Sequence, residues 1–225
     1  EHFKLAKYAY GKGYHFVIKD KLKAFMHTLE KEIGAIEGRV FVDSAPVMER
    51  QWAEKAGLGW IGKNTLLINK EQGSFFFLAE LIIDLELTYD GPIKDYCGTC
   101  SRCVEACPTD AITPYALDAS KCISYLTIEL KDEIPSAFQN QMEGWAFGCD
   151  ICQDVCPWNR FSRPHREAQF SPKDELKDLF NNNWEDLTTE VFQSVFKNSP
   201  VKRTKLKGFK RNLAFLKKIK PAQRT

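Results

Sequence analysis

The sequence has no apolar run of about eighteen residues, so it predicts no transmembrane helix. Its first residues, Glu1-His2-Phe3-Lys4, fit neither an initiator methionine nor a signal peptide, and we expect the chain to begin inside a longer, cytoplasmic protein. No Walker loop or dinucleotide fingerprint occurs, which argues against these two phosphate-binding classes. Cysteine is absent outside residues 97–156, so all eight cysteines belong to one region.

That region opens with four cysteines in the run Cys97-Gly-Thr-Cys100-Ser-Arg-Cys103-Val-Glu-Ala-Cys107-Pro108. Gaps of two, two and three residues followed by proline are typical of bacterial ferredoxins, which bind [4Fe–4S] clusters. Three thiolates of such a run ligate one cluster from a single loop, whereas the fourth ligates a second cluster. The pattern therefore requires a partner run.

The partner run is Cys149-Asp-Ile-Cys152-Gln-Asp-Val-Cys156-Pro157, and it lacks one cysteine. Ala146 stands where a regular run places its first cysteine, and we interpret Cys122, the remaining thiol, as the substitute ligand. One cluster is predicted to bind Cys97, Cys100, Cys103 and Cys156. The other is predicted to bind Cys107, Cys122, Cys149 and Cys152.

Disulfides and zinc are the alternatives to two clusters. Disulfide scaffolds are small secreted domains without a sizeable core, whereas this chain has 225 residues and is 44% hydrophobic. A four-cysteine zinc site needs two separated pairs and leaves both Cys-Pro endings without a purpose. We therefore favour two [4Fe–4S] clusters, and cysteines reserved for iron favour a reducing cytoplasm.

The net charge of +2 conceals an asymmetry. Residues 197–225 carry eight lysines, three arginines and no acid, while the rest of the chain has 21 basic and 30 acidic residues. A segment of charge +11 on an acidic body predicts contact with a polyanion such as nucleic acid. The alternative interpretation is a solvated helix face that keeps the protein soluble.

The chain divides into three predicted parts. Residues 1–96 are expected to form an α/β domain, in which residues 1–10 end a helix and residues 20–33 form an amphipathic helix with one packed face. Residues 97–165 form the cluster module, where residues 118–130 are predicted to be one helix that carries Cys122 and Ser124. Residues 166–225 are predicted to be a helical, basic C-terminal segment.

Asp43 is the first candidate for catalysis. It follows a predicted strand, Arg39–Val42, and opens the corner Asp43-Ser44-Ala45-Pro46, with Ser44 expected as the N-cap of a helix that stops at Gly57. Loops at the carboxyl ends of strands in α/β folds carry much of their chemistry. The alternative is that Asp43 is a second capping residue.

A glycine-rich stretch follows, from Leu58 to Thr65, with Gly57 just before it. Glycines at this density let the backbone approach a ligand closely, and Lys63, Asn64 and Thr65 add polar groups there; a bound cofactor and a plain turn remain equally supported. Residues 66–68 and 74–84 are then predicted to pair as a hairpin, with 75–83 a strand buried on both faces.

Together these motifs resemble the epoxyqueuosine reductase family, enzymes that remove the epoxide oxygen from a modified guanosine in the anticodon loop of tRNA. The resemblance covers most of the chain. The matching stretches are Gly13-Tyr14-His15, residues 42–49 and 57–65, both cysteine runs, residues 122–129 and residues 198–204.

The resemblance implies a corrinoid-binding α/β domain similar to reductive dehalogenases, with an inserted ferredoxin-like module and a helical C-terminal part. It also implies cobalamin bound with its lower base away from cobalt, and the sequence has no Asp-x-His-x-x-Gly cobalamin motif. The clusters would pass electrons one at a time to a cobalt that attacks the epoxide, and Asp43 would protonate the oxygen. An acid of this kind needs a raised pKa, so we expect Asp43 to be buried against the corrin with few donors around it.

The resemblance also suggests contacts and partners. Expected corrinoid contacts are Asp43, Lys63, Asn64, Thr65 and Ser124. Expected tRNA phosphate contacts are Lys202, Arg203, Lys205, Lys210 and Arg211. We further expect an external low-potential electron donor, no membrane partner and a monomer.

Two functions from other classes compete with this one. An iron–sulfur electron-transfer module of a larger oxidoreductase, including one like a reductive dehalogenase, explains the cysteines but leaves Asp43 and the glycine-rich stretch without a task. A nucleic-acid-binding protein with structural clusters explains the basic segment but not the need for two clusters. Corrinoid uptake separates the first alternative from the reductase, and the effect of replacing Asp43 separates the second.

Overall fold

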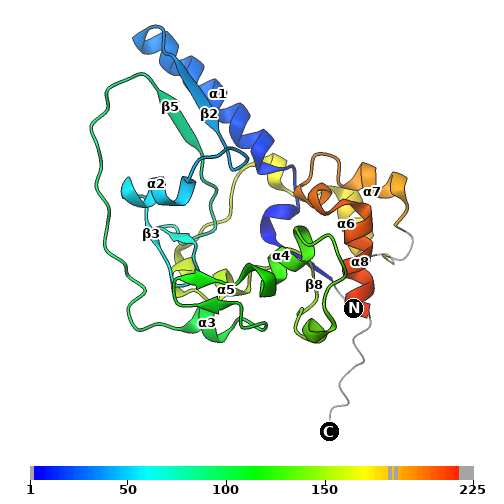
Figure 1. Ribbon diagram of the computed structural model, residues 1–225. Helices are drawn as coiled ribbons and strands as arrows, with labels where there is room; N and C mark the ends of the chain where they lie inside the picture. Colours follow the sequence, from blue (N-terminus) through cyan, green and yellow to red (C-terminus); the bar gives the residue numbers. More distant parts are fainter. Residues whose placement is uncertain (1–2, 182–183, 185–186, 218–225) are drawn as a thin grey trace.

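The computed structural model describes residues 3–181, 184 and 187–217 and contains both helices and short strands (Figure 1). Its strands are β1 (Lys4–Leu5), β2 (Gly38–Phe41), β3 (Trp60–Ile61), β4 (Leu67–Ile68), β5 (Glu80–Ile83), β6 (Ile112–Thr113), β7 (Ala116–Leu117) and β8 (Trp145–Phe147). Its helices are α1 (Tyr14–Ile33), α2 (Glu49–Lys55), α3 (Arg102–Glu105), α4 (Ile123–Ile128), α5 (Ile151–Asp154), α6 (Asp174–Asn181), α7 (Thr189–Val195) and α8 (Lys205–Lys217). The predicted mixture of helix and strand is confirmed.

The strands pair two by two. β1 and β8 are parallel, and β2–β5, β3–β4 and β6–β7 are antiparallel. The predicted hairpin of residues 66–68 with 74–84 is therefore wrong, because β4 pairs with β3 and β5 pairs with β2. Nor is 75–83 one buried strand, because β5 begins only at Glu80. Phe77 precedes the strand and stacks on Tyr14 with 4.3 Å between ring centroids.

The main hydrophobic core lies where residues 3–9 pack against β8, α4, α7 and α8. β1 pairs with β8, and α4, α7 and α8 pack around them, which buries the rings of Phe147, Phe196 and Phe209. The prediction of a helix ending in residues 1–10 is wrong, because the chain there forms β1 and a short 3₁₀ turn. Burial of several such rings at about 1.5–3 kcal/mol each explains why the termini are held together.

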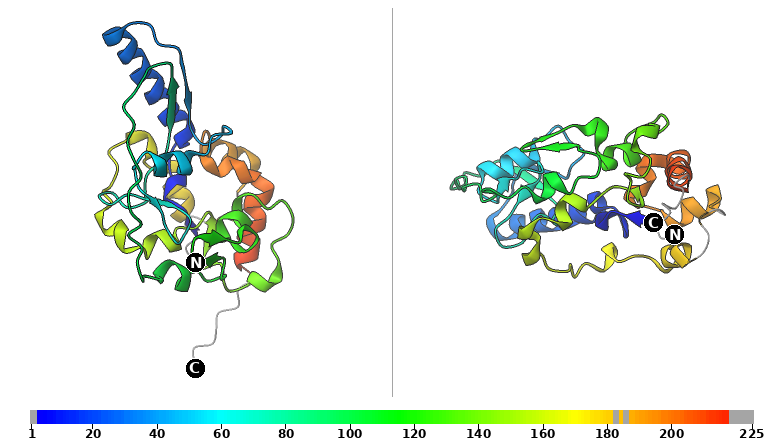
Figure 2. Two further views of the ribbon diagram at one scale, coloured as in Figure 1. Left: turned by 60° about the vertical axis from the view of Figure 1, so that its left-hand side comes forward. Right: turned by 90° about the horizontal axis from the view of Figure 1, so that it is seen from below.

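A projecting arm is built from α1, β2 and β5 (Figures 1 and 2). The helix predicted over 20–33 is confirmed, and it begins earlier, after Gly13. Its apolar face is less buried than expected: Leu22, Met26 and Leu29 are half-buried, and Val17 is the buried residue of α1. The arm therefore gains little of its stability from a packed core.

The corner after β2 differs from the prediction. α2 begins at Glu49 after Met48, so Ser44 is not its N-cap, and residues 43–46 form bends before the helix. The predicted stop at Gly57 is confirmed, with a φ of +72°. A Cβ at Gly57 would lie 2.4 Å from the carbonyl oxygen of Gly91, so the close passage of the 84–96 connection past α2 requires glycine.

The helix predicted over 118–130 is interrupted at Cys122. Residues 119–121 form a 3₁₀ turn, Cys122 is extended with φ −68° and ψ 126°, and α4 starts only at Ile123. Cys122 is therefore the N-cap position of α4 and not part of the helix. No helix in the described part of the chain is both long and apolar enough to span a bilayer.

Candidate functional site

The first predicted set of cysteines comes together around one small cavity. Its four thiols, from Cys97, Cys100, Cys103 and Cys156, line a cavity of about 50 Å³, together with Trp158 and Pro157. Burial raises the pKa of Cys103 and of Cys156, and the neighbouring thiolates of the same set raise both further. The loop of residues 97–103 and Cys156, two residues after α5, thus meet at a common site.

The second set also converges. Burial raises the pKa of Cys149 to about 12, and the charges of Cys122 and Cys107 add to it. Burial likewise raises the pKa of Cys152, with contributions from Cys149 and Cys122, from Cys103 of the first set and from Cys107. Thiols arranged in this way resist ionisation unless a cation offsets their charge, and bound metal does so because it deprotonates its ligands outright. All eight cysteines are free thiols, which does not support the disulfide alternative.

Hydrogen bonds reach sulfurs of both sets. Trp60 Nε1 donates to Cys97 Sγ at 3.4 Å, and the backbone N–H of Ala111 donates to Cys107 Sγ at 3.4 Å. Donors to cluster sulfurs stabilise the more negative, reduced form of a cluster. Both sets are therefore placed where the protein can tune a reduction potential.

Two residues predicted to contact a corrinoid donate hydrogen bonds to the cysteine loops. Lys63 Nζ donates to the carbonyl oxygens of Gly98 at 2.7 Å and Cys100 at 3.0 Å. Asn64, only 3% exposed, donates through Nδ2 to the Cys152 carbonyl at 3.4 Å. These contacts account for the polar residues of the glycine-rich stretch without a further ligand.

Thr65 and Ser124, which were also predicted to contact a corrinoid, make local hydrogen bonds. Thr65 has φ +65° and accepts a hydrogen bond on its carbonyl oxygen from Arg50. Ser124 is half-buried on α4 and accepts a bond on its carbonyl from Thr127 Oγ1. Among the described residues, none of Lys63, Asn64, Thr65 and Ser124 lines the large cleft described next.

A cleft of about 1490 Å³ lies beside the cysteine sets. Cys156 belongs to its wall, and Tyr8, Tyr14 and the Phe75–Phe77 run supply aromatic surface. Its remaining lining residues are Lys7, Ser74, Arg102, Glu105, Ala106, Asp150, Gln153, Asp154, Val155, Pro157, Asn159, Arg160, Ser162, Arg163, Pro164, His165 and Phe170. The cleft is larger than most small-ligand pockets, which measure about 300–1,000 Å³.

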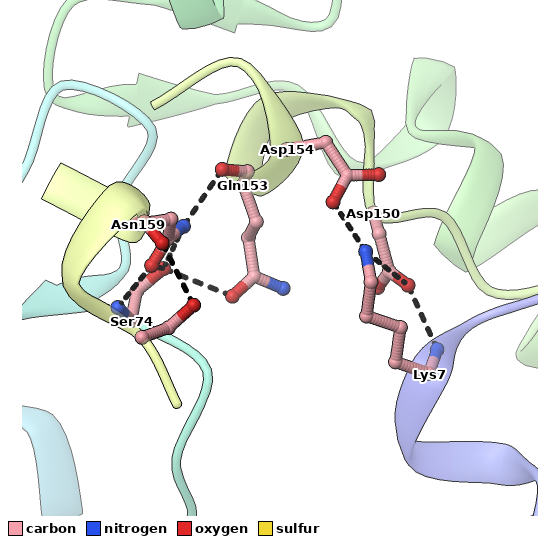
Figure 3. A network of polar contacts seen from close by, with 7 residues as sticks. Lys7, Ser74, Asp150, Gln153, Asp154 and Asn159 are labelled. Carbon is pink, nitrogen blue, oxygen red and sulfur yellow. Dashed lines mark hydrogen bonds and ion pairs between the residues drawn. The ribbon is translucent and has the colours of Figure 1, made fainter. Parts of the chain in front are cut away.

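Two polar networks connect residues that line the cleft (Figure 3). In one, the backbone N–H of Lys7 donates to buried Asp150 at 2.7 Å and its ammonium pairs with Asp154. In the other, Asn159 accepts from the Ser74 backbone at 2.6 Å and donates to the Gln153 carbonyl at 2.7 Å. The networks join the 3₁₀ turn at Lys7 to Asp150 and Asp154, and Ser74 to Gln153 and Asn159, so two segments that line the cleft are bonded to the second cysteine run.

Asp43 lies at the edge of this cleft, linked to it through Tyr14. The Tyr14 hydroxyl donates to Asp43 Oδ2 at 2.5 Å, and His15 Nε2 lies 2.8 Å from the same oxygen. The expectation of few donors around this carboxyl is wrong, because Tyr14 and His15 of α1 both contact it. Its side chain is 53% exposed, and its burial against a corrin ring stays a prediction. Burial raises the pKa of Tyr14, and the bond to Asp43 raises it further, so Tyr14 remains a neutral donor.

The predicted tRNA contacts fall into two groups. Lys202, Lys205 and Lys210 are exposed. Arg203 pairs with Glu129, while Arg211 donates to the carbonyls of Leu126 at 2.8 Å, Leu130 at 2.7 Å and Asp132 at 2.6 Å. The Arg211 guanidinium therefore connects α8 to the end of α4, a structural task that competes with phosphate contact.

The site contains residues that sequence reasoning did not single out. Tyr8, Glu49 and Glu80 are examples, since each acts electrostatically on Asp43 or its partner Tyr14. Glu80 sits on β5 directly opposite Phe41 of β2, two residues before Asp43. Only the strand register brings Glu80 to the site, so a correct pairing of β2 with β5 was the signal that could have found it.

Comparisons with known proteins agree with this geometry. Residues 96–159 match the family described as "4Fe-4S double cluster binding domain", and residues 1–44 match "Epoxyqueuosine reductase QueG, DUF1730". The epoxyqueuosine reductase of Leadbetterella byssophila is 63% identical over 96% of this chain and 71% of its own length. That of Cyclobacterium marinum is 68% identical over 95% of this chain and 69% of its own length.

Solved structures extend the similarity to the fold. An epoxyqueuosine reductase crystallised with an epoxyqueuosine-modified tRNA-Tyr stem loop is similar with a TM-score of 0.86 and 31% identity, over 96% of this chain and 57% of that chain. The enzyme from Bacillus subtilis, described with its aspartate catalytic loop swung out of the active site, gives 0.84 and 30% over 96% and 57%. This chain thus spans little more than half the length of those two proteins. By its identity to relatives of which it covers more than two thirds, the chain belongs to the epoxyqueuosine reductase family.

Proposed function

We propose that the protein reduces epoxyqueuosine to queuosine in tRNA, with two [4Fe–4S] clusters, a corrinoid and Asp43 as proton donor. The observation that carries the proposal is the position of Asp43. Its carboxylate is bonded to Tyr14, and Tyr14 lines the same cleft as the cluster ligand Cys156. This arrangement supports a proton donor and an electron source that act at one cavity.

Iron–sulfur clusters suit the two cysteine sets. Each set supplies four thiols, the number that a [4Fe–4S] cluster takes, and each has a hydrogen-bond donor at a sulfur. Cys149 and Cys152 can be buried as thiolates only if a cation offsets their negative charge, as iron would. The assignment of Cys97, Cys100, Cys103 and Cys156 to one cluster, and of Cys107, Cys122, Cys149 and Cys152 to the other, follows these groupings.

The large cleft suits a corrinoid in size and lining. Tyr8, the Phe75–Phe77 run and Phe170 offer apolar faces to a flat ring system, and Lys7, Arg160 and Arg163 offer donors to its polar substituents. These residues replace Lys63, Asn64, Thr65 and Ser124 as our candidates for holding it. When bound, a corrinoid supplies a strongly nucleophilic cobalt that takes up single electrons.

Asp43 supplies the proton in this proposal. Removal of the epoxide oxygen as water consumes two electrons and two protons, and the oxygen gains negative charge as its first bond to carbon breaks. A positioned acid contributes about 10²–10⁴-fold to such a step. The neutral Tyr14 hydroxyl orients the Asp43 carboxyl at 2.5 Å, and the His15 ring, 2.8 Å away, is placed to return the proton after each turnover.

The substrate is expected to be a tRNA anticodon loop, as in the solved relative that holds a modified stem loop. Lys202, Lys205 and Lys210 are exposed and can contact phosphates, which position the RNA without reading its sequence. The modified base must leave its stack to enter a cleft, as bases of single-stranded loops do. A cytoplasmic monomer that receives electrons from a low-potential protein donor completes the proposal.

Anaerobic reconstitution with iron, sulfide and cobalamin, followed by metal analysis and an assay on epoxyqueuosine-containing tRNA, tests this function. About eight irons and one cobalt per chain are expected. Asp43→Asn should lower turnover about 10²–10⁴-fold with both metals retained, whereas Asp90→Asn, an exposed aspartate of the 84–96 connection, should not. Iron without cobalt would favour the electron-transfer alternative, and full activity of Asp43→Asn would overturn the acid assignment.

A further inference from the structure

Three carboxyl groups crowd the loop after β2. Asp43 belongs to the loop itself, Glu49 opens α2, and Glu80 opens β5 opposite Phe41. Glu49 Oε1 accepts the backbone N–H of Asp43 at 2.5 Å. Asp43 needs such a restraint, because its φ of +56° lies in the left-handed region that non-glycine residues seldom adopt.

Glu80 lies behind Glu49. Its carboxyl group is within hydrogen-bond reach of the Glu49 carboxyl, and both side chains are half-buried. Two carboxylates cannot bond to each other, since an ionised carboxylate only accepts. One member of the pair must hold a proton, and Glu49 is already engaged as the acceptor of the Asp43 N–H.

The surroundings assign that proton to Glu80. Its Oε2 is buried and, within the described residues, has no hydrogen-bond partner, which disfavours a charged carboxylate. Burial, then the adjacent Glu49 and then Asp43 together raise the pKa of Glu80 to about 7. Within the described part of the chain, the charged groups that shift the pKa of Glu80 are Glu49, at the start of α2, and Asp43, in the loop after β2.

We propose that Glu80 is a positioning residue: as a neutral acid it donates to Glu49 and so fixes the Asp43 loop in its left-handed conformation beside the cleft. When Glu80 ionises, it repels Glu49 and Asp43, and the loop loses its anchor. The proton on Glu80 thus links the geometry of Asp43 to pH. The inference rests on the proposed role of Asp43, but the conformational part of it does not depend on that role.

Two substitutions and one control test the proposal. Glu80→Gln keeps a donor for Glu49 and cannot ionise, whereas Glu80→Leu removes the donor. Glu86→Gln makes the same chemical change at an exposed glutamate three residues past the end of β5. Backbone hydrogen exchange of residues 42–48 is measured from about pH 6 to about pH 8, corrected for intrinsic exchange, and reports on the loop without any substrate.

Residues 42–48 of the unaltered protein and of Glu86→Gln should be protected at about pH 6 and lose protection through about pH 7, where Glu80 ionises. Glu80→Gln should stay protected across this range, and Glu80→Leu should be unprotected throughout. In the tRNA assay, kcat of Glu80→Leu should fall about 10²-fold at unchanged KM, since a misplaced catalytic group costs that much. Glu80→Gln should keep kcat above about pH 7, where the unaltered protein loses it.

Exchange that is independent of pH in the unaltered protein, or equal in Glu80→Gln and Glu80→Leu, would overturn the proposal. Loss of iron from Glu80→Leu would mark a folding defect, and Glu80→Gln then decides alone through its pH profile. If exchange behaves as expected but Asp43→Asn is fully active, the positioning of the loop holds and the proposed function of Asp43 fails. The two failures are therefore distinguishable.

Discussion

Trp60 donates a hydrogen bond from its indole nitrogen to the sulfur of Cys97 over 3.4 Å. Trp60 is almost fully buried and packs edge-on against Tyr96 and Trp158, so the donor has little freedom to turn away. A donor at a cluster sulfur stabilises the reduced state and raises the potential. Trp60→Phe keeps most of the packing and removes the donor.

We expect Trp60→Phe to make the reduction potential of one of the two clusters more negative and to leave the other unchanged. Redox titration followed by electron paramagnetic resonance measures both. Trp52→Phe, at an exposed tryptophan of α2, serves as the control and should shift neither potential. Equal shifts of both clusters in Trp60→Phe would contradict the assignment of Cys97 to a single set.

The division of the cysteines predicts selective loss of iron. Cys156→Ala removes a ligand of the set that surrounds the small cavity, and Cys122→Ala removes a ligand of the other set. Each variant should keep about four of about eight irons after anaerobic reconstitution. The remaining cluster should differ between the two variants in its potential. A full iron content in Cys122→Ala would show that Cys122 is not a ligand.

The exposed lysines of the basic segment predict a salt effect. Replacing Lys202, Lys205 and Lys210 by Gln should weaken tRNA binding and flatten its dependence on salt by up to about one unit of log–log slope per lost phosphate contact. Fluorescence anisotropy over a salt series gives that slope. A variant with Lys19, Lys23 and Lys31 of α1 replaced by Gln removes the same charge elsewhere. Identical slopes in the two variants would argue for a non-specific charge effect.

Asn212 predicts a cost in stability. It is fully buried on α8 and donates to the carbonyls of Thr127 at 2.8 Å and Ala146 at 2.9 Å, which joins α8 to α4 and β8. Asn212→Leu leaves both carbonyls unsatisfied, and we expect a loss of about 1–3 kcal/mol per group in the free energy of unfolding. Denaturant unfolding measures it. Gln193→Leu, an exposed amide on α7, should change stability by less than about 0.5 kcal/mol.

The cysteine spacing predicted a double-cluster domain, and the first set of thiols does line one cavity, because the ferredoxin pattern is local. Three cysteines within one short loop can hardly avoid a common site, and proline after the last one ends the turn. The interruption at Cys122 was not predictable in the same way. Apolar periodicity over 118–130 suits a helix, but the chain gives up helical bonds there and leaves Cys122 in an extended conformation.

The candidate active site was only partly predictable because long-range pairing builds it. Asp43 was identified from its place after a strand, yet the donors around it were not foreseen, since Tyr14 and His15 come from a helix that starts about thirty residues earlier. Lys63 and Asn64 looked like ligand-binding groups because short polar residues beside glycines suit many tasks. Only the contacts to Gly98 and Cys152 reveal that they support the cysteine loops.

The parallel pairing of Leu5 with Phe147 has a consequence for how the protein is made. The ribosome delivers the amino-terminal strand first, but its partner emerges only after both the first cysteine run and Cys122 have been synthesised. Contacts so distant in sequence form slowly, because the entropy cost of closing a long loop comes before the contacts stabilise the chain. The first strand must therefore wait, unpaired, until Phe147 has been translated, and both clusters still lack ligands at that point, because Cys149, Cys152 and Cys156 follow β8.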